Sequence, residues 1–372
     1  MRTIAWLISW TAFLSSSCSR VAEMKNESDG EALVIEAQAA KDRYDFDEAI
    51  AKFRAALDKF EKAGSYERSA WVHLSLADLH RVRSEYDQQL AELEAAYQDA
   101  TRDRGSPALA AAALCHTASH FNSLGRPVEA WDRLRAAFAI LQHNGANVQW
   151  GSIRNMCQQI EGSLYLSQGD YRDALAALDM AEQNWGGDPC RLSIENTRGF
   201  TELRLGNTER AEKIYRDMDA CVQRNGSKPE GKAIASYGMA EVALKKGDLE
   251  EALKLFTTCY EIGKSNIGEG SMAAAWPYGE IGHVCRRMGR LDEALEHGTR
   301  AVAIMERKNP YAAMEQLENL GVTLYLLGRK EEGLARLRKS AALREEAFSA
   351  AHPEAIRVRK VIADLEAGTF VE

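Results

Sequence analysis

Apolar positions along most of the chain recur at the three- and four-residue spacing of amphipathic helices, and short turns interrupt them. One such turn, with the start of the next segment, reads KGDLEEAL at 246–253, and a similar stretch, MGRLDEAL, lies at 288–295. The glycine can close one helix in the left-handed conformation, and an Asp or Asn beside it can begin the next. The pattern therefore predicts pairs of antiparallel helices joined by tight turns.

The same unit recurs eight times. A usually small residue near the end of each turn stretch, such as Ala252 in KGDLEEAL, serves as an anchor. Successive anchors are 40, 41, 44, 37, 41, 42 and 39 residues apart. Twelve positions before the anchor, all eight copies have Ala or Gly, and four positions after it, seven have a large apolar or aromatic residue. Because these columns lie outside the pattern that defined the anchors, we predict a true repeat. The anchors are Ala49, Gln89, Ala130, Ala174, Ala211, Ala252, Ala294 and Gly333.

Small residues in two columns let paired helices approach closely, and the large residue fills the space beside them. A single hairpin cannot bury its apolar face alone, so the units are expected to stack into a curved solenoid. HEAT and armadillo repeats have periods of about 40–47 residues and are the structural alternative. They do not share the small-residue columns, so we favour a different repeat.

The columns resemble the tetratricopeptide repeat, in the long form found in kinesin light chains. The stretch 317–356 is the most similar, including the His-Pro-Glu at 352–354. The resemblance covers residues 31–366, with departures at Gln89, in place of the small anchor, and Gly298, in place of the large residue. It implies an all-α, right-handed superhelical solenoid of about eight tetratricopeptide-like hairpins plus a C-terminal capping helix.

The N-terminus has the layout of a secretory signal: one Arg, an apolar run from Ile4 to Leu14, then small residues. The run is shorter than the roughly 20 residues that span a bilayer. Its end resembles a bacterial lipoprotein signal in which Cys18 is lipidated; ordinary cleavage near Cys18 is the alternative. Ser19 after that cysteine implies sorting to the outer membrane.

These features predict four parts of the chain. They are a signal peptide at 1–17, a lipid-attachment cysteine with a flexible tether at 18–30, eight repeats at 31–352, and a capping helix with a tail at 353–372.

The chemistry in the sequence is sparse. The net charge of −8, without a dense basic face, argues against nucleic-acid binding. The chain has no glycine-rich phosphate loop, GxSxG elbow or CxxC pair, so we predict no cofactor and no catalysis. His116 and His120 are four residues apart beside Cys115 and could face one metal ion. We favour packing roles for them and predict no metal site.

Six cysteines remain after Cys18, and an exported protein can oxidise them. Cys190 begins the first helix of its unit and Cys221 ends the second. An antiparallel hairpin brings those ends together, so this pair is the candidate disulfide. Cys259 lies seven positions after its anchor, in a column that is Ala in most copies, so packing explains it.

The resemblance implies that first helices line a concave groove. Polar groups mixed with aromatic rings there suit peptide binding, which needs orientation and buried area. The alternative is that the same residues form the solvated side of the superhelix. The candidate groove residues are Trp71, Asp78, Arg81, Asn122, Gln159, Asn196, Arg204, Tyr237, Glu241, Trp276, His283 and Arg287.

We therefore predict a non-enzymatic scaffold that binds a protein or peptide partner in its groove. It would be an envelope lipoprotein on the periplasmic side, with membrane contact only through the lipid anchor. A peptide-responsive sensor and a toxin-neutralising immunity protein are the alternatives. A hydrolase built on Glu241, His283 and Arg287 is the least favoured one.

Overall fold

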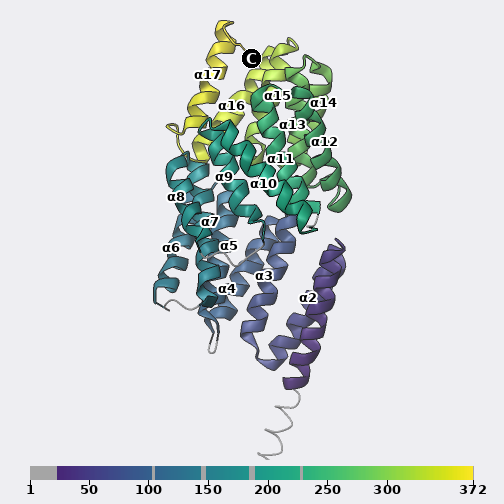
Figure 1. The fold of residues 1–372 in the computed structure, drawn as a ribbon, viewed down its shortest axis with the longest axis vertical. Coiled ribbons are helices and arrows are strands. Elements are labelled where there is room, and N and C mark those ends of the chain that lie inside the picture. The colour runs from purple at the N-terminus through teal and green to yellow at the C-terminus, as the bar shows by residue number, and fades with distance from the viewer. Residues whose placement is uncertain (1–22, 103–104, 144–147, 184–188, 227–228, 372) are drawn as a thin grey trace, which may run out of the picture. The chain divides into compact units, whose positions relative to one another are not determined.

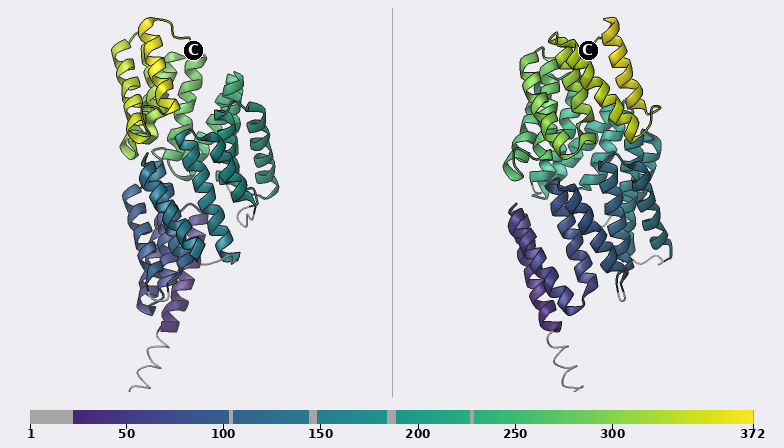
Figure 2. Two further views of the ribbon diagram at one scale, coloured as in Figure 1. Left: turned by 90° about the vertical axis from the view of Figure 1, so that its left-hand side faces the viewer. Right: turned by 180° about the vertical axis from the view of Figure 1, so that it is seen from behind.

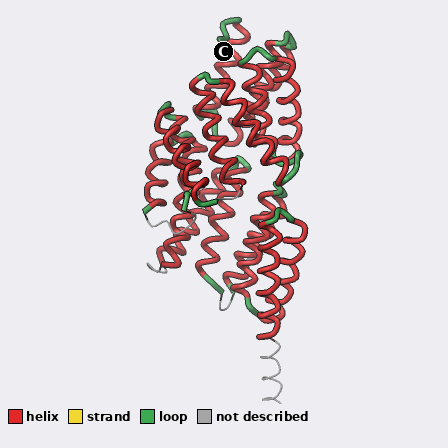
Figure 3. The backbone as a smooth tube through the Cα atoms, turned by 45° about the vertical axis from the view of Figure 1, so that its right-hand side comes forward, coloured by secondary structure: helices red, strands yellow, loops and turns green. Residues whose placement is uncertain are grey.

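The described residues are helical apart from short turns and loops, and they contain no strand (Figure 3). The computed structural model describes residues 23–102, 105–143, 148–183, 189–226 and 229–371. No helix in these ranges combines the length and the apolar character that crossing a membrane requires. The predicted signal peptide and Cys18 lie outside them. Two compact units make up the chain, residues 1–114 (unit 1) and 115–372 (unit 2).

The helices form consecutive antiparallel hairpins, numbered one to eight in chain order, followed by a final helix (Figure 1). Residues 23–42 are the first helix of hairpin one. The remaining elements are α2 (Phe46–Ala63), α3 (Tyr66–Val82), α4 (Tyr86–Thr101), α5 (Pro107–Ser123), α6 (Pro127–His143), α7 (Val148–Gln168), α8 (Tyr171–Glu182), α9 (Leu192–Arg204), α10 (Thr208–Arg224), α11 (Pro229–Lys246), α12 (Leu249–Asn266), α13 (Met272–Arg287), α14 (Leu291–Lys308), η1 (Pro310–Ala313), α15 (Met314–Leu326), α16 (Lys330–Ala347) and α17 (Pro353–Ala367). The predicted all-α solenoid is confirmed.

Left-handed residues close the turns within the hairpins, as the glycine pattern predicts. In hairpins three to eight the residue is a glycine, for example Gly125 with φ of 65° and Gly328 with φ of 83°. Hairpins one and two lack the glycine, and Tyr44 and Ser84 adopt the same conformation with φ of 62° and 56°. A residue with a Cβ is strained there by roughly 1–2 kcal/mol. The turn geometry is therefore kept even where the sequence does not favour it.

The repeat columns form the core. The anchor Ala174 and the large residue Leu178 are both fully buried, and a Cβ on Gly162 would lie 2.9 Å from Leu178. In hairpins five and six, Gly199 and Gly238 both face the ring of Tyr215, to which an added Cβ would approach within 2.4 and 2.1 Å. The column twelve positions before the anchor is thus small because the large residue of the same hairpin fills that space. Gly238 lies two positions before that column and makes room for Tyr215 of the preceding hairpin.

The last helix, α17, closes the solenoid as predicted. It packs on α16 and is the yellow helix in both views of Figure 2. Its side chains Val358 and Leu365 are buried in one apolar cluster with Leu337 of α16. The helix therefore covers the apolar face that the eighth hairpin would otherwise expose.

Residues 23–30, the first that the structure describes, are already helical, so the flexible tether predicted over residues 18–30 is wrong for 23–30. Gly30 lies against the ring of Phe60, to which an added Cβ would come within 2.6 Å. Arg68 pairs with Glu31 at 2.8 Å on the same surface. Polar composition suggested a tether, but residues 23–30 extend the amphipathic pattern far enough to pack on α2.

Segments far apart in the sequence meet within unit 2. Asn309 Nδ2 donates to the carbonyl of Ser123 at 2.6 Å, 186 residues away. His352 caps α17 by accepting from the Glu354 amide through Nδ1, so its Nε2 carries the proton that it donates to the Ser167 carbonyl at 3.0 Å. The later hairpins therefore curve back to the start of the unit, and first helices several hairpins apart face a common interior.

Two disulfides lie in unit 2. One joins Cys190 before α9 to Cys221 near the end of α10, the pair that the hairpin geometry predicts. The other joins Cys115 of α5 to Cys157 of α7 and was not predicted. Since Cys115 is bonded, it is not free to complete a metal site with His116 and His120.

Candidate functional site

Three of the predicted groove residues lie in unit 1. Trp71 packs edge to face on Phe53, with ring centroids 6.2 Å apart, and remains 43% exposed. Asp78 pairs with Lys41 and with Arg81, each at 2.6 Å. Burial opposes ionisation of Asp78, but Arg81 and Lys41 outweigh it and hold its pKa below the usual range. The charges and hydrogen-bonding groups of Asp78 and Arg81 are thus already paired with each other.

The groove residues on α5 and α7 mainly make contacts between or within helices. Asn122 accepts from the Ser167 hydroxyl at 2.9 Å, which links α5 to α7. Gln159 donates to the hydroxyl of Ser163, one turn further along α7, at 3.2 Å. Asn196 of α9 takes part through its backbone, whose carbonyl accepts from the Tyr215 hydroxyl at 3.2 Å.

The first helices of hairpins five to eight contribute charged side chains to one place, which we call the acidic cluster: Arg204, Glu241, Glu280 and Glu315. Arg204 lies 3.8 Å from Glu315 although two hairpins, six and seven, lie between them in the sequence. Glu280 is 2% exposed and accepts from Gln316 Nε2 at 2.5 Å. Successive hairpins therefore place three carboxylates near the guanidinium of Arg204, with Lys245 as a further cation near Glu241 and Arg286 near Glu280.

The charge imbalance in the acidic cluster shifts proton affinities. Burial raises the pKa of Glu280 to about 8, and the nearby charge of Glu315 adds to the shift. Burial also raises the pKa of Glu241 well above its usual range, with Glu280 and Glu315 contributing. Arg204 and Lys245 oppose the shift of Glu241, and Gln316, Arg204 and Arg286 oppose that of Glu280, without reversing either. The cluster therefore favours the binding of positive charge. When no other cation is bound, protons on the carboxyl groups supply that charge.

The aromatic and imidazole groups predicted for the groove border this cluster. Tyr237 lies between Phe200 and Phe256, with ring centroids 6.0 and 5.2 Å away. His283 Nδ1 lies 3.4 Å from a carboxylate oxygen of Glu280. These contacts join an aromatic surface to the acidic cluster.

An ion-pair network continues from the cluster to the end of the chain. Arg204 lies 3.5 Å from Glu354 of α17, 150 residues away, and Glu354 pairs with Arg357 at 2.8 Å. Arg357 in turn contacts Glu318 at 2.5 Å, and Glu318 lies 3.3 Å from Arg344 of α16. The position of Arg204 is thereby tied to α15, α16 and α17.

The two remaining groove candidates have structural partners. Trp276 is half-buried and packs on an apolar cluster that includes Met272 and Leu320. Arg287 Nη1 donates to the Leu244 carbonyl at 2.8 Å and links hairpins six and seven. The three residues considered for a hydrolase, Glu241, His283 and Arg287, therefore do not contact one another as a group: Arg287 binds this carbonyl and His283 faces Glu280.

Glu280, Glu315 and Glu318 were not among the groove residues predicted from the sequence. Glu318 lies 15 residues before the anchor Gly333, in the column that contains Asn196 and Tyr237, so extending the columns to the eighth hairpin would have found it. Glu280 lies in a neighbouring column, and no sequence signal places it beside Glu315.

Comparison with known proteins agrees with this architecture. Residues 232–307 and 314–354 match family models described as tetratricopeptide repeat. The chain therefore carries tetratricopeptide repeats, whose scaffolds typically bind proteins. No curated protein gave a significant match.

A Rap protein complexed with competence and sporulation factor shares the fold, with a TM-score of 0.57 and 13% identity over 91% of this chain and 99% of that one. A tetratricopeptide repeat protein from Parabacteroides merdae covers 80% of this chain and 99% of its own, at 15% identity and a TM-score of 0.44. A putative kinesin light chain from Podospora anserina covers 51% and 93%, at 16% identity and a TM-score of 0.38.

Proposed function

We propose that the chain is a non-enzymatic scaffold that binds a positively charged segment of a protein or peptide at the acidic cluster of unit 2. One observation carries the proposal: Glu241, Glu280 and Glu315 gather near Arg204, and the pKa values of Glu241 and Glu280 stay raised although Lys245 and Arg286 are also near them. A Lys or Arg side chain, or a peptide amino terminus, would supply the missing charge and the hydrogen-bond donors.

The surroundings of the cluster support a peptide as the ligand. The rings of Phe200 and Tyr237 lie 6.0 Å apart beside it and offer apolar area to a neighbouring side chain. Aromatic area beside buried charge is the usual composition of a binding hot spot. The Rap protein of similar fold, complexed with competence and sporulation factor, is an example of such a solenoid with a bound factor.

Selection from a library of short random peptides, at low ionic strength, tests this proposal. We expect the purified chain to enrich peptides with Lys or Arg, and the double variant Glu241→Gln, Glu315→Gln to lose that enrichment. The control is Glu332→Gln, an exposed carboxylate of α16 that pairs with Arg329. Enrichment of neutral or acidic peptides, or equal enrichment by both variants, would contradict the proposal.

A sensor is the second candidate, and one observation favours it. The contacts of Arg204 with Glu315 and Glu354, at 3.8 and 3.5 Å, are long for ion pairs, yet they join α9 to α15 and α17. A bound cation would compete with Arg204 for these carboxylates and release the contact. Small-angle scattering with and without the selected peptide should then show a changed radius of gyration. Identical profiles would contradict the sensor and favour a scaffold that does not change shape on binding.

We also propose that Cys18 anchors the protein to the bacterial envelope, on the periplasmic side. The support is the lipoprotein-type sequence that ends at this cysteine. Fractionation of cells that produce the wild type or Cys18→Ala tests it: the wild type should sediment with membranes and the variant should not. Equal membrane association of both would refute the anchor.

A further inference from the structure

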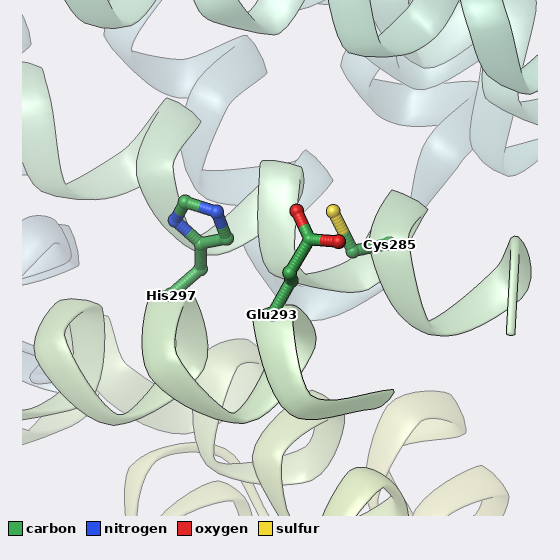
Figure 4. Close-up of side chains that lie close together, drawn as sticks. All are labelled: Cys285, Glu293 and His297. Carbon is green, nitrogen blue, oxygen red and sulfur yellow. The ribbon is translucent and has the colours of Figure 1, made fainter. Parts of the chain in front are cut away.

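Hairpin seven contains a group of three potential metal ligands that has no counterpart among the described residues of the other hairpins. Cys285 lies on α13, and Glu293 and His297 lie one turn apart on α14 (Figure 4). One potential ligand atom from each residue lies within 4.8 Å of the other two. Cys285 is buried and free of a disulfide, whereas Glu293 is exposed, so the group can be reached from solvent.

Comparison with the equivalent positions of the other repeats shows which members of this group are unusual. An acidic residue directly before the anchor is common in the repeat, so the position of Glu293 alone is unremarkable. Cysteine and histidine, in contrast, stand in columns that hold other residues elsewhere. The residues that correspond to Cys285 are Ala40, His80, Phe121, Tyr165, Glu202, Ala243 and Leu324, and those that correspond to His297 are Lys52, Glu92, Arg133, Ala177, Ile214, Leu255 and Arg336.

The helices α13 and α14 lie close together beside this group. A Cβ on Gly282 would lie 3.1 Å from the backbone nitrogen of Gly298 and 3.2 Å from the Cβ of His297. Hairpin eight is equally close, since a Cβ on Gly321 would lie 2.8 Å from the carbonyl oxygen of Gly333. The close approach therefore belongs to the repeat, and the Cys and His side chains are what is particular to hairpin seven.

The imidazole is held by packing rather than by a hydrogen bond through Nδ1. The ring of Tyr278 stands edge to face against it, with centroids 4.5 Å apart and planes at 79°. Nδ1 of His297 is buried and has no hydrogen-bond partner among the described residues. In Figure 4 one ring nitrogen points toward Glu293, whose carboxylate lies between the imidazole and the thiol of Cys285.

We propose that Cys285, Glu293 and His297 form a zinc site. Sulfur, imidazole nitrogen and carboxylate oxygen together are the ligand types that Zn²⁺ accepts in tetrahedral sites, and the thiol disfavours Mg²⁺ and Ca²⁺. Three protein ligands leave the fourth position for water. A bound ion would fasten α13 to α14 and so fix the helix that presents Glu280 and His283 to the acidic cluster.

Arg290 competes with the ion. Its Nε donates to Glu293 at 2.7 Å, and its Nη2 donates to the second carboxylate oxygen. A metal ion must displace this guanidinium or share the carboxylate with it, and the positive charge of Arg290 repels the ion in either case. Replacing Arg290 should therefore strengthen zinc binding, an effect that a purely structural role of the three residues would not produce.

Titration of the purified full chain with Cd²⁺ under non-reducing conditions tests the site, because thiolate–cadmium bonds absorb in the ultraviolet and bonded cysteines stay silent. We expect a thiolate band that saturates at one ion per chain and is abolished in Cys285→Ser. Cys259→Ser, which removes the other buried free thiol, should leave the band unchanged.

Competition between Zn²⁺ and a chromophoric chelator then measures affinity. We expect Glu293→Gln and His297→Ala each to weaken zinc binding by roughly tenfold or more, because losing a direct ligand should cost at least as much affinity as losing an outer-shell partner. Glu293 is exposed, so its replacement cannot disturb the core. Arg290→Gln should tighten zinc binding. Absence of the band in the wild type, its persistence in Cys285→Ser, or unchanged zinc affinity in Glu293→Gln would overturn the proposal.

Discussion

The buried carboxyl group of Glu280 makes the stability of the fold depend on pH. Its pKa is raised to about 8 in the folded protein, because it is 2% exposed and faces the charge of Glu315. In the unfolded chain it ionises with a pKa of about 4.3. Between these two values the folded state holds a proton that the unfolded state has lost.

The folded state therefore loses stability as the pH rises through this window. Each pH unit costs about 1.4 kcal/mol for this one group, and the contribution levels off below about pH 4 and above about pH 8. Glu280→Gln has no proton to lose. The stability of the variant relative to the wild type should therefore increase steadily from about pH 5 to about pH 8.

Urea unfolding followed by circular dichroism at several pH values in this window measures the difference. Glu332→Gln serves as the control, because the Arg329 hydrogen bond lowers the pKa of Glu332 and moves its titration out of the window. A difference between Glu280→Gln and the wild type that stays constant with pH would refute the reasoning.

Three further changes probe the repeat itself. Ser84→Gly should raise the free energy of unfolding by roughly 0.5–1 kcal/mol, since relief of the strained φ of 56° exceeds the entropic cost of glycine; a lower urea midpoint would contradict this. Gly238→Ala should destabilise by roughly 1–3 kcal/mol, because its Cβ would lie 2.1 Å from the ring of Tyr215; an unchanged melting temperature would show that the ring moves freely. Joint replacement of Cys190 and Cys221 by Ser should cost about 3–4 kcal/mol, as expected for a bond that closes 31 residues, and an unaltered urea midpoint would argue against the bond in solution.

The sequence predicted the hairpins well because each is a local structure. Turn glycines, small anchors such as Ala174 and large partners such as Leu178 all lie within one repeat or its neighbour. Their spacing is therefore enough to place them. The Cys190–Cys221 pair follows from the same local geometry.

The contacts across unit 2 could not be predicted in this way. Whether Arg204 meets Glu354 depends on small rotations that accumulate over four hairpins, and no single repeat encodes them. The Cys115–Cys157 bond has a related cause, because it depends on the angle between α5 and α7. The acidic cluster was found only in part, since Arg204 and Glu241 lie in predicted groove columns but Glu280 does not.

The group in hairpin seven was missed for a different reason. Cys285 and His297 each occupy an ordinary helical position, and only the coordinates show that their side chains meet across α13 and α14. Cys285 and His297 are twelve residues apart on two helices, a spacing that resembles no metal motif.

Proton release on peptide binding tests the central claim, the recognition of a cation by the acidic cluster, most directly. At about pH 7 the folded protein keeps Glu280 protonated, because its pKa is about 8. A positive side chain bound beside it would lower that pKa and expel the proton. Calorimetric titration of the selected cationic peptide in buffers of different ionisation enthalpy measures the release. We expect proton release that is reduced in Glu280→Gln and disappears when Glu241→Gln is added to it, because burial raises the pKa of both carboxyl groups. Proton uptake, or release that the double variant retains in full, would contradict recognition of a cation by the cluster.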